Sequence, residues 1–410
     1  MRWRDRLRTR PTERTDRPNL RAAMSTSAVA AGLIAVIVSY AGPMAIVFQA
    51  ADAGRLGEVR LESWVWAISI GSGITCIALS WAYRAPVLTA WSTPGAALLV
   101  SGLTAYSYGE AVGAFLLAAL ATVLVGATGL FGTVMRLLPQ SVAAAMLAGI
   151  LLSFGIDVFR AADTSPGLIA VMLTGYVLAR RLAPRWATAW TLLLGCLYTA
   201  VAGQADFSGV KLSIATPELT APSFSPDAAV GLALPLFLVT MASQNAPGIA
   251  VLRSAGYDTN PDRLVVTTGV ASAVLAPVGA HAINLAAITA AICTGREAHE
   301  DPNRRYVAGI TCGAGYLLVG IFGTALVGLF TALPTELVAA VAGIALLGAI
   351  GASLATATAD ERHRDGALVA FLVTASDIEW WGVGSPFWGL ILGVATHLLT
   401  THPWPRKTPN

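Results

Sequence analysis

The sequence has little charge: of its 410 residues only 12% are Asp, Glu, Lys or Arg, whereas 55% are hydrophobic. A soluble globular domain usually carries about 25% charged residues, because its surface must be solvated. Half of that supply cannot cover a water-exposed surface, so a soluble protein is excluded. The mean hydropathy of +0.67 and the recurring apolar stretches of about 18 residues or more are typical of transmembrane helices.

Cysteine is also scarce, and several catalytic motifs are missing. The four cysteines lie in apolar segments without metal-site spacing, so we expect them to pack as small side chains. Neither a Walker A sequence nor a GxSxG elbow occurs, and Asn303 stands where an HExxH motif starting at His299 needs its second histidine. We therefore expect no metal, no cofactor and no enzymatic activity.

The apolar segments predict an all-α polytopic membrane protein with fourteen crossings. Two of the segments, 87–103 and 279–293, are short and interrupted by Pro or Gly. The others are 28–50, 63–81, 111–135, 141–158, 166–182, 186–204, 229–252, 263–277, 305–330, 335–357, 364–381 and 385–400.

The basic residues give an independent test of this number of crossings. Eight arginines lie in the first 21 residues, and we interpret residues 1–24 as a disordered basic arm at the cytoplasmic membrane surface. With that arm inside and fourteen crossings, 22 of the 26 basic residues fall on the cytoplasmic side. The exceptions are Arg55, Arg60, Arg160 and Lys211. Both termini are therefore expected in the cytoplasm.

The two halves of the chain resemble each other at a nearly constant offset. Ala85-Pro86-Val87 recurs as Ala276-Pro277-Val278, and Leu124-Val125-Gly126 recurs as Leu318-Val319-Gly320. We expect one repeat at 25–204, an extracellular or periplasmic linker at 205–228 and a second repeat at 229–402. Seven crossings in each repeat invert the second relative to the first, which is typical of secondary transporters. A duplicated membrane scaffold or enzyme is the alternative.

The third and tenth segments are expected to be discontinuous, each an extended piece followed by a half-helix. Pro94 follows Ser92 and Thr93, which are good helix caps, and Asn284 occupies the position that matches Thr93 at an offset of 191. Two half-helix N-termini inside the membrane would create a site for a small organic anion without a Lys or Arg.

Four motifs carry a resemblance to a known family. The sequences at 40–43 (YAGP), 92–95 (STPG), 243–248 (SQNAPG) and 280–285 (AHAINL) resemble the benzoate:proton symporter family over about residues 25–400. The resemblance implies the seven-plus-seven inverted-repeat fold shared with nucleobase and sulfate transporters, in a bacterial inner membrane. It further implies a core domain of crossings 1–4 and 8–11, a gate domain of crossings 5–7 and 12–14, and elevator-like motion between them. The acids and tryptophans at 377–381 depart from the family pattern.

The candidate substrate residues each have a structural alternative. Gln244 and Asn245, adjacent amides in the eighth crossing, contact substrate or form interhelical hydrogen bonds. Asn284, Ser92 and Thr93 are helix caps or ligands. The aromatic rings of Trp91 and Tyr40 stack on an aromatic substrate or pack in the core.

Three residues are candidates for carrying a proton. His281 is the histidine expected within the membrane, and it is either a proton carrier or a structural hydrogen-bond donor. Asp157 and Glu379 are the other candidates, although both lie near the ends of predicted crossings and are expected to face water.

We therefore expect a proton-coupled symporter for benzoate or a related small aromatic carboxylate, with an elevator-type mechanism. A facilitative or channel-like pathway for another small organic anion or a nucleobase is the alternative. The expected partners are the carboxylate, protons and the lipid bilayer, not nucleic acid, and a homodimer is left open.

Overall fold

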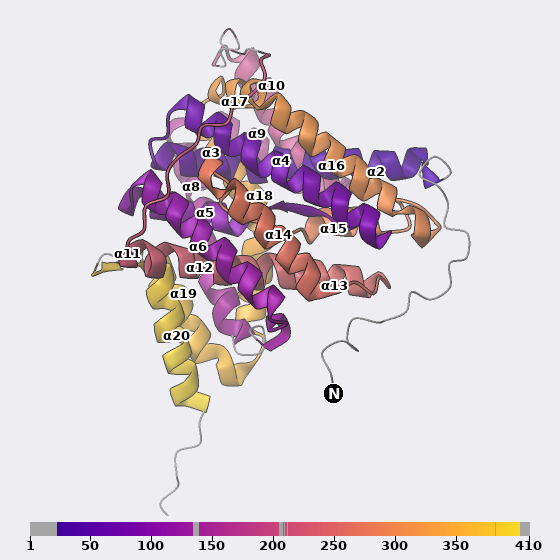
Figure 1. Ribbon diagram of the computed structural model, residues 1–410. Coiled ribbons are helices and arrows are strands. Elements are labelled where there is room, and N and C mark those ends of the chain that lie inside the picture. Colours follow the sequence, from indigo (N-terminus) through magenta and orange to yellow (C-terminus); the bar gives the residue numbers. More distant parts are fainter. Residues whose placement is uncertain are drawn as a thin grey trace, which may run out of the picture.

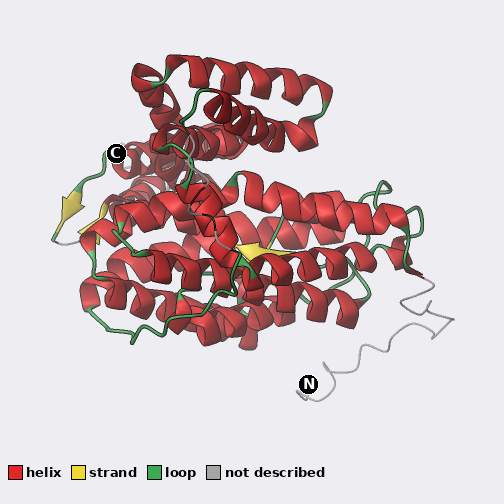
Figure 2. Cartoon of the chain, turned by 90° about the horizontal axis from the view of Figure 1, so that it is seen from above, coloured by secondary structure: helices red, strands yellow, loops and turns green. Residues whose placement is uncertain are grey.

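The computed structural model describes residues 23–133, 139–204, 208, 210, 212–381 and 383–401. The basic arm predicted at 1–24 lies almost wholly outside this range, as do Arg136, Lys211 and residues 402–410. Helices make up most of the described chain, and the strands form two short pairs (Figure 2).

The described part of each of the fourteen predicted apolar segments consists mainly of one or more helices, with a strand before the helix at 87–103 and 279–293 and after it at 364–381. In the first half, the elements are α2 (Thr26–Ala41), α3 (Pro43–Ala53), α4 (Glu58–Tyr83), β1 (Thr89–Trp91), α5 (Thr93–Ala105), α6 (Tyr108–Ala127), α8 (Gln140–Thr164), α9 (Pro166–Leu182) and α10 (Ala187–Val201). In the second half, they are α11 (Pro226–Ala228), α12 (Leu234–Thr240), α13 (Ala246–Ser254), α14 (Pro261–Leu275), β2 (Ile283–Leu285), α15 (Ile288–Thr294), α16 (Tyr306–Ile321), α17 (Gly323–Thr331), α18 (Thr335–Thr358), α19 (Arg364–Ala375), β3 (Glu379–Trp380), β4 (Val383–Gly384) and α20 (Ser385–Thr401).

The prediction of an all-α protein with several membrane spans is confirmed. Within the described ranges, six helices are long and apolar enough to cross a membrane, or seven if α16 and α17 are counted as one span bent by 70°. Several of the remaining segments are shorter, because Gly or Pro interrupts them or because a strand takes up part of their length, as with β1 before α5.

The contacts between the helices, which are labelled in Figure 1, divide them into two bundles. In the larger bundle α4 packs on α16, α6 on α14, α16 on α2, and α3 on α5. In the smaller bundle α8 packs on α18 and α19, α19 on α20, and α9 on α10. The bundles meet where α3 contacts α18, α2 contacts α10 and α5 contacts α8, so an interface runs between them.

The segment between the repeats crosses the larger bundle in an extended form. The N–H of Ala215 donates to the carbonyl of Ile321 at 2.9 Å, and that of Ser223 donates to the carbonyl of Gly109, also at 2.9 Å. The linker predicted at 205–228 ends three residues earlier than expected, because Ser225 caps α11 and the helix begins at Pro226. These contacts attach its described part to the larger bundle.

One local expectation was wrong: Asn284 does not cap a helix. It lies in the middle of β2, and α15 begins at Ile288 with Ala287 at its cap position and no capping side chain. The reason is a short 3-10 turn at Ala276–Val278 followed by Gly279 at a φ of +105°, after which the chain continues as a strand. The half-helix therefore starts four residues later than the offset of 191 predicted.

Candidate functional site

The two interrupted segments meet at their strands. β1 and β2 pair antiparallel, with Thr89 opposite Leu285, Ala90 opposite Asn284 and Trp91 opposite Ile283. Each strand leads into a short helix, α5 or α15. The antiparallel pairing brings together segments that are almost 200 residues apart in the chain, and it lies close to the interface between the bundles.

Ser92, directly after β1, joins this strand pair to the neighbouring elements. Its hydroxyl accepts a hydrogen bond from the N–H of Gly95 at 3.0 Å, and so caps α5 as the sequence predicted. The same hydroxyl accepts from Thr240 of α12 at 3.1 Å. With its amide oriented to satisfy both neighbours, Asn284 accepts from the N–H of Ser92 at 2.9 Å and donates to the carbonyl of Leu285 at 3.0 Å. Ser92 and Asn284 therefore fix the strand crossing.

His281 is buried beside Ser92 and uses both ring nitrogens. Trp64 donates its indole N–H to Nδ1 at 2.9 Å, and Nε2 lies 3.0 Å from the carbonyl of Ser92. This arrangement is that of a neutral imidazole with its hydrogen on Nε2. A second proton, on Nδ1, would place two N–H groups face to face.

The adjacent amides Gln244 and Asn245 face different surroundings. They lie in a π-helical segment, Met241–Asn245, of the kind that often occurs at functional sites. Asn245 is fully buried, and its oxygen accepts from the N–H of Leu285 at 3.0 Å, so it holds β2. Gln244 is half-buried and lines a cavity between the bundles.

That cavity has a volume of about 310 Å³ and is mostly apolar. The larger bundle contributes residues near the starts of α5 and α15, together with Gln244, and the smaller bundle contributes residues of α8, α9, α10 and α18. The lining includes Ser39, Pro43, Ile46, Trp91, Thr93, Leu151, Tyr176, Arg180, Thr188, Gln244, Ile288, Thr289, Ile292, Ala345 and Leu346. We call it the central cavity.

Two residues that line the central cavity each carry a buried polar atom for which the structure gives no hydrogen-bond partner. They are Nε1 of Trp91, a residue that is 2% exposed, and Oγ1 of Thr289, a residue that is 6% exposed. Buried donors are nearly always paired with protein, water or ligand, so each of these two atoms is able to donate to a group or a water in the cavity. The rings of Tyr40 and Tyr316 pack against the Trp91 indole at centroid distances of 5.1 and 5.9 Å, which fixes its orientation.

Tyr40 itself does not line the cavity. Its hydroxyl donates to Ser69 at 2.6 Å, and its side chain is buried against Trp91. It supports the site from behind.

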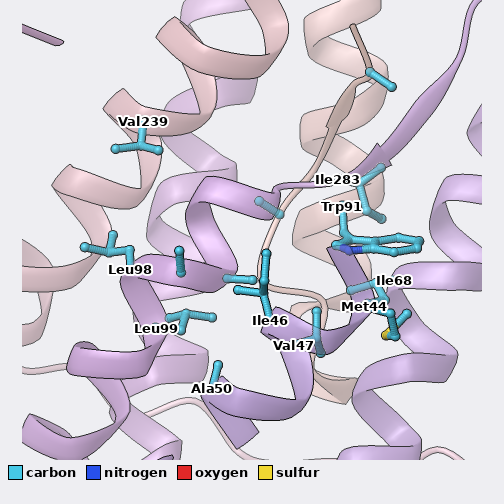
Figure 3. Packing of buried hydrophobic residues seen from close by; sticks show 14 of the residues in the cluster. Met44, Ile46, Val47, Ala50, Ile68, Trp91, Leu98, Leu99, Val239 and Ile283 are labelled. Carbon is cyan, nitrogen blue, oxygen red and sulfur yellow. The ribbon is translucent and has the colours of Figure 1, made fainter. Parts of the chain in front are cut away.

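Two further cavities lie along the same interface. One of about 440 Å³, the acidic cavity, is lined by Asp157, Arg160, Asp377 and Glu379. Another of about 450 Å³, the alanine cavity, is lined by small residues of α8, α13 and α18 and shares Ala349 with the central cavity. Buried apolar side chains, among them Ile46, Val47 and Leu98, pack together in the core (Figure 3), where Ile46 also lines the central cavity and Leu98 the acidic cavity.

The acids of the acidic cavity lie near water, as the sequence predicted. Asp157 pairs with Arg160 at 3.0 Å, with 41% of its side chain exposed, and Glu379 is exposed in β3. Within the described ranges, no group of three or more His, Cys, Asp or Glu side chains could hold a metal ion.

The sequence-predicted residues thus divide between two places. Trp91, Thr93 and Gln244 line the central cavity, whereas Ser92, Asn245, Asn284 and His281 form the network behind it. Sequence reasoning missed Thr289, Ser39 and Arg180. Thr289 could have been found by matching the starts of the two half-helices at the correct offset, while Arg180 resembles any arginine at the end of a crossing.

The chain is similar to several known proteins. A family model described as benzoate membrane transport protein matches residues 22–399. The benzoate membrane transport protein of Acinetobacter baylyi is 42% identical over 384 residues, covering 94% of this chain and 98% of that protein. The inner membrane protein YdcO of Escherichia coli is 45% identical over 363 residues, covering 88% and 93% of the two chains.

Two solved structures share the fold at low sequence identity. The anion transporter SLC26A9 has a TM-score of 0.64 at 15% identity, and the match covers 91% of this chain but only 64% of that one. The transmembrane domain of a cyanobacterium bicarbonate transporter, BicA, has a TM-score of 0.55 at 13% identity, covering 92% and 96%.

Proposed function

Because the chain belongs to the benzoate membrane transport protein family, we propose that it carries benzoate, or a closely related aromatic carboxylate, across a bacterial inner membrane together with a proton. The observation that carries this proposal is the pair of unpartnered polar atoms, Trp91 Nε1 and Thr289 Oγ1, on residues that line a mostly apolar cavity. The chain is a membrane transport protein and not an enzyme.

The central cavity supports an aromatic carboxylate in particular. An apolar slot with a few polar groups is the usual architecture of a small-molecule site, and about 310 Å³ is the size of a small one. The carboxylate would accept from Trp91 and Thr289, with Thr93 and Gln244 in the same wall, while the ring would lie against Ile46, Leu151 and Leu346. Ser92, Asn245, Asn284 and Tyr40 would act by holding these groups in place.

The three cavities support a route across the molecule along α8. Residues 140–147 of this helix line the alanine cavity, Leu151 lines the central cavity, and residues 150–160 line the acidic cavity. The helix has 25 residues, which corresponds to about 37 Å and exceeds the roughly 30 Å hydrocarbon core of a bilayer. Fourteen crossings with both termini cytoplasmic would place the acidic cavity outside and the alanine cavity inside.

We propose that the larger bundle is a mobile core domain and the smaller bundle a gate domain, with elevator-like motion between them. The substrate donors belong to the larger bundle, whereas α8, α9, α10 and α18 form the opposite wall. The symmetric pairs α4–α16 and α6–α14, together with the antiparallel strands, support two inverted repeats.

For the proton we favour the acidic cavity over His281. The imidazole already satisfies both nitrogens in its neutral form, so protonation would break the bond from Trp64. Asp157 and Glu379 line the acidic cavity and can exchange protons with water. A proton moving with a monoanion makes transport electroneutral, which avoids work against the membrane potential.

Uptake into proteoliposomes tests the proposal. We expect radiolabelled benzoate to accumulate when an inward-directed proton gradient is imposed, with the outside more acidic. When an uncoupler collapses this gradient, benzoate should equilibrate without accumulation. Uracil and sulfate, offered at the same concentration, should not compete. Accumulation that survives the uncoupler would contradict proton coupling, and transport limited to equilibration under the gradient would favour a facilitative pathway.

A further inference from the structure

One charged side chain lines the central cavity, and it is not on the bundle that carries the donors. Among the described residues around this cavity, Arg180 alone bears a charge. It lies in the last turn of α9, in the smaller bundle, and its side chain is exposed.

The guanidinium of Arg180 is not committed to another charge. Its Nη1 donates to the neutral hydroxyl of Tyr176 at 3.3 Å, and none of the ion pairs between described residues includes it. Arg160, which lines the acidic cavity, differs because it pairs with Asp157. Arg180 therefore offers unused donors and a positive charge to a cavity that is otherwise neutral.

A cation at the mouth of a low-dielectric cavity raises the local concentration of anions, and a guanidinium binds a carboxylate more strongly than a neutral donor does. We propose that Arg180 is a state-specific anchor for the substrate carboxylate, an inference that rests on the proposed function. The neutral donors travel with the larger bundle, whereas Arg180 stays on the smaller one. The anion meets Arg180 only in the arrangement seen here, in which α9 and the starts of α5 and α15 border one cavity.

A group that contacts the ligand in one state alone favours that state when ligand is bound. The orientation proposed above places the C-terminal end of α9 on the cytoplasmic side. Arg180 therefore makes the transporter asymmetric: benzoate binds more tightly from the cytoplasmic side than the neutral donors alone would allow, and its release there is slower.

The test is benzoate exchange in oriented proteoliposomes, with the half-saturating concentration measured from each side while the opposite side is saturated. For Arg180→Gln we expect the half-saturating benzoate concentration to increase about tenfold on the cytoplasmic side and to stay unchanged on the external side. Arg180→Lys keeps the charge and should stay within about threefold of wild type. Arg181→Gln is the matched control, because Arg181 is the next residue of the same helix and does not line the cavity.

Two further measurements separate charge from folding. Benzamide, a neutral analogue, should inhibit wild type and Arg180→Gln equally from the cytoplasmic side. Raising ionic strength should weaken cytoplasmic benzoate binding in wild type and not in the variant. An equal change on both sides, or the same effect from Arg181→Gln, would overturn the inference. If the wild type does not exchange benzoate, the proposed function fails as well, whereas exchange unaltered by Arg180→Gln removes this inference alone.

Discussion

Trp91 differs from a tryptophan that only packs in the core, because its indole is fixed in orientation and its N–H is unpaired. Its ring is held by Tyr40 and Tyr316, yet its N–H has no partner although the side chain is almost fully buried. Leaving such a donor unsatisfied costs about 1–3 kcal/mol, so a carboxylate that accepts from it recovers that free energy.

We expect Trp91→Phe and Thr289→Val to weaken benzoate binding by roughly tenfold each, because each removes one donor; Thr289→Val nearly preserves shape, and Trp91→Phe keeps an aromatic ring of smaller size. Isothermal titration calorimetry with purified protein would measure the dissociation constant of each variant. Tyr40→Phe is the control: it removes the bond to Ser69 but lines no cavity wall, so it should leave affinity within about twofold. Equal losses in all three variants would indicate a general packing effect and not carboxylate contacts.

Adjacent residues of one motif should separate in their effects. Asn245→Ala would leave the buried N–H of Leu285 without an acceptor, which costs about 1–3 kcal/mol of folding free energy and should lower the thermal midpoint. Gln244→Ala should weaken benzoate binding at an unchanged midpoint, because its side chain faces the central cavity. Thermal unfolding in detergent, paired with a binding titration, distinguishes them. An unchanged midpoint for Asn245→Ala would contradict the assigned role.

At the scale of elements, the strand crossing explains both what the sequence predicted and what it did not. The breaks at Pro94 and after Pro277 follow from local chemistry, since proline removes a donor and disfavours helix in the preceding residue. The position of Asn284 in β2 depends on Ala90, its partner across the strand pair, and on Ser92, whose N–H it accepts, and only the folded chain brings these two residues near it. The π-helical turn that directs Gln244 and Asn245 apart has no sequence signature of its own.

His281 belongs to this crossing, and its variants test which role it has. Gln can donate to the carbonyl of Ser92 and accept from Trp64, so His281→Gln should retain both uphill uptake and benzoate–benzoate counterflow if the ring is a positioning group. Glu379→Gln should instead abolish accumulation driven by the pH gradient while counterflow persists. Loss of accumulation in His281→Gln with intact counterflow would indicate that the imidazole of His281 carries the proton.

At the scale of the whole molecule, composition predicted the membrane, and the internal repeat predicted related halves. The division into two bundles follows from contacts between helices that are far apart in the chain, such as α8 with α18. A single sequence does not show which distant helices pack together. Orientation is a separate matter, because it depends on the charge of loops. Leu219→Cys, in the exposed linker, should react with an impermeant maleimide applied to intact cells, and Glu361→Cys should react only after permeabilisation. The reverse pattern would invert the orientation.

If transport follows the proposed alternating access, the acidic and alanine cavities open to water in turn. Ser153 lines the acidic cavity and Ala352 lines the alanine cavity, and both side chains are exposed in the present arrangement. A cysteine at each position reports on one side of the interface. If the bundles slide past each other, conditions that increase labelling of Ser153→Cys must decrease labelling of Ala352→Cys, since the larger bundle would cover one cavity as it uncovers the other. A channel-like pathway would leave the two labelling rates independent.

We expect saturating external benzoate with a pH gradient to shift the two labelling rates in opposite directions, as measured by maleimide labelling from each side. The inhibitory control is Trp91→Phe, in which weakened binding should reduce both shifts together.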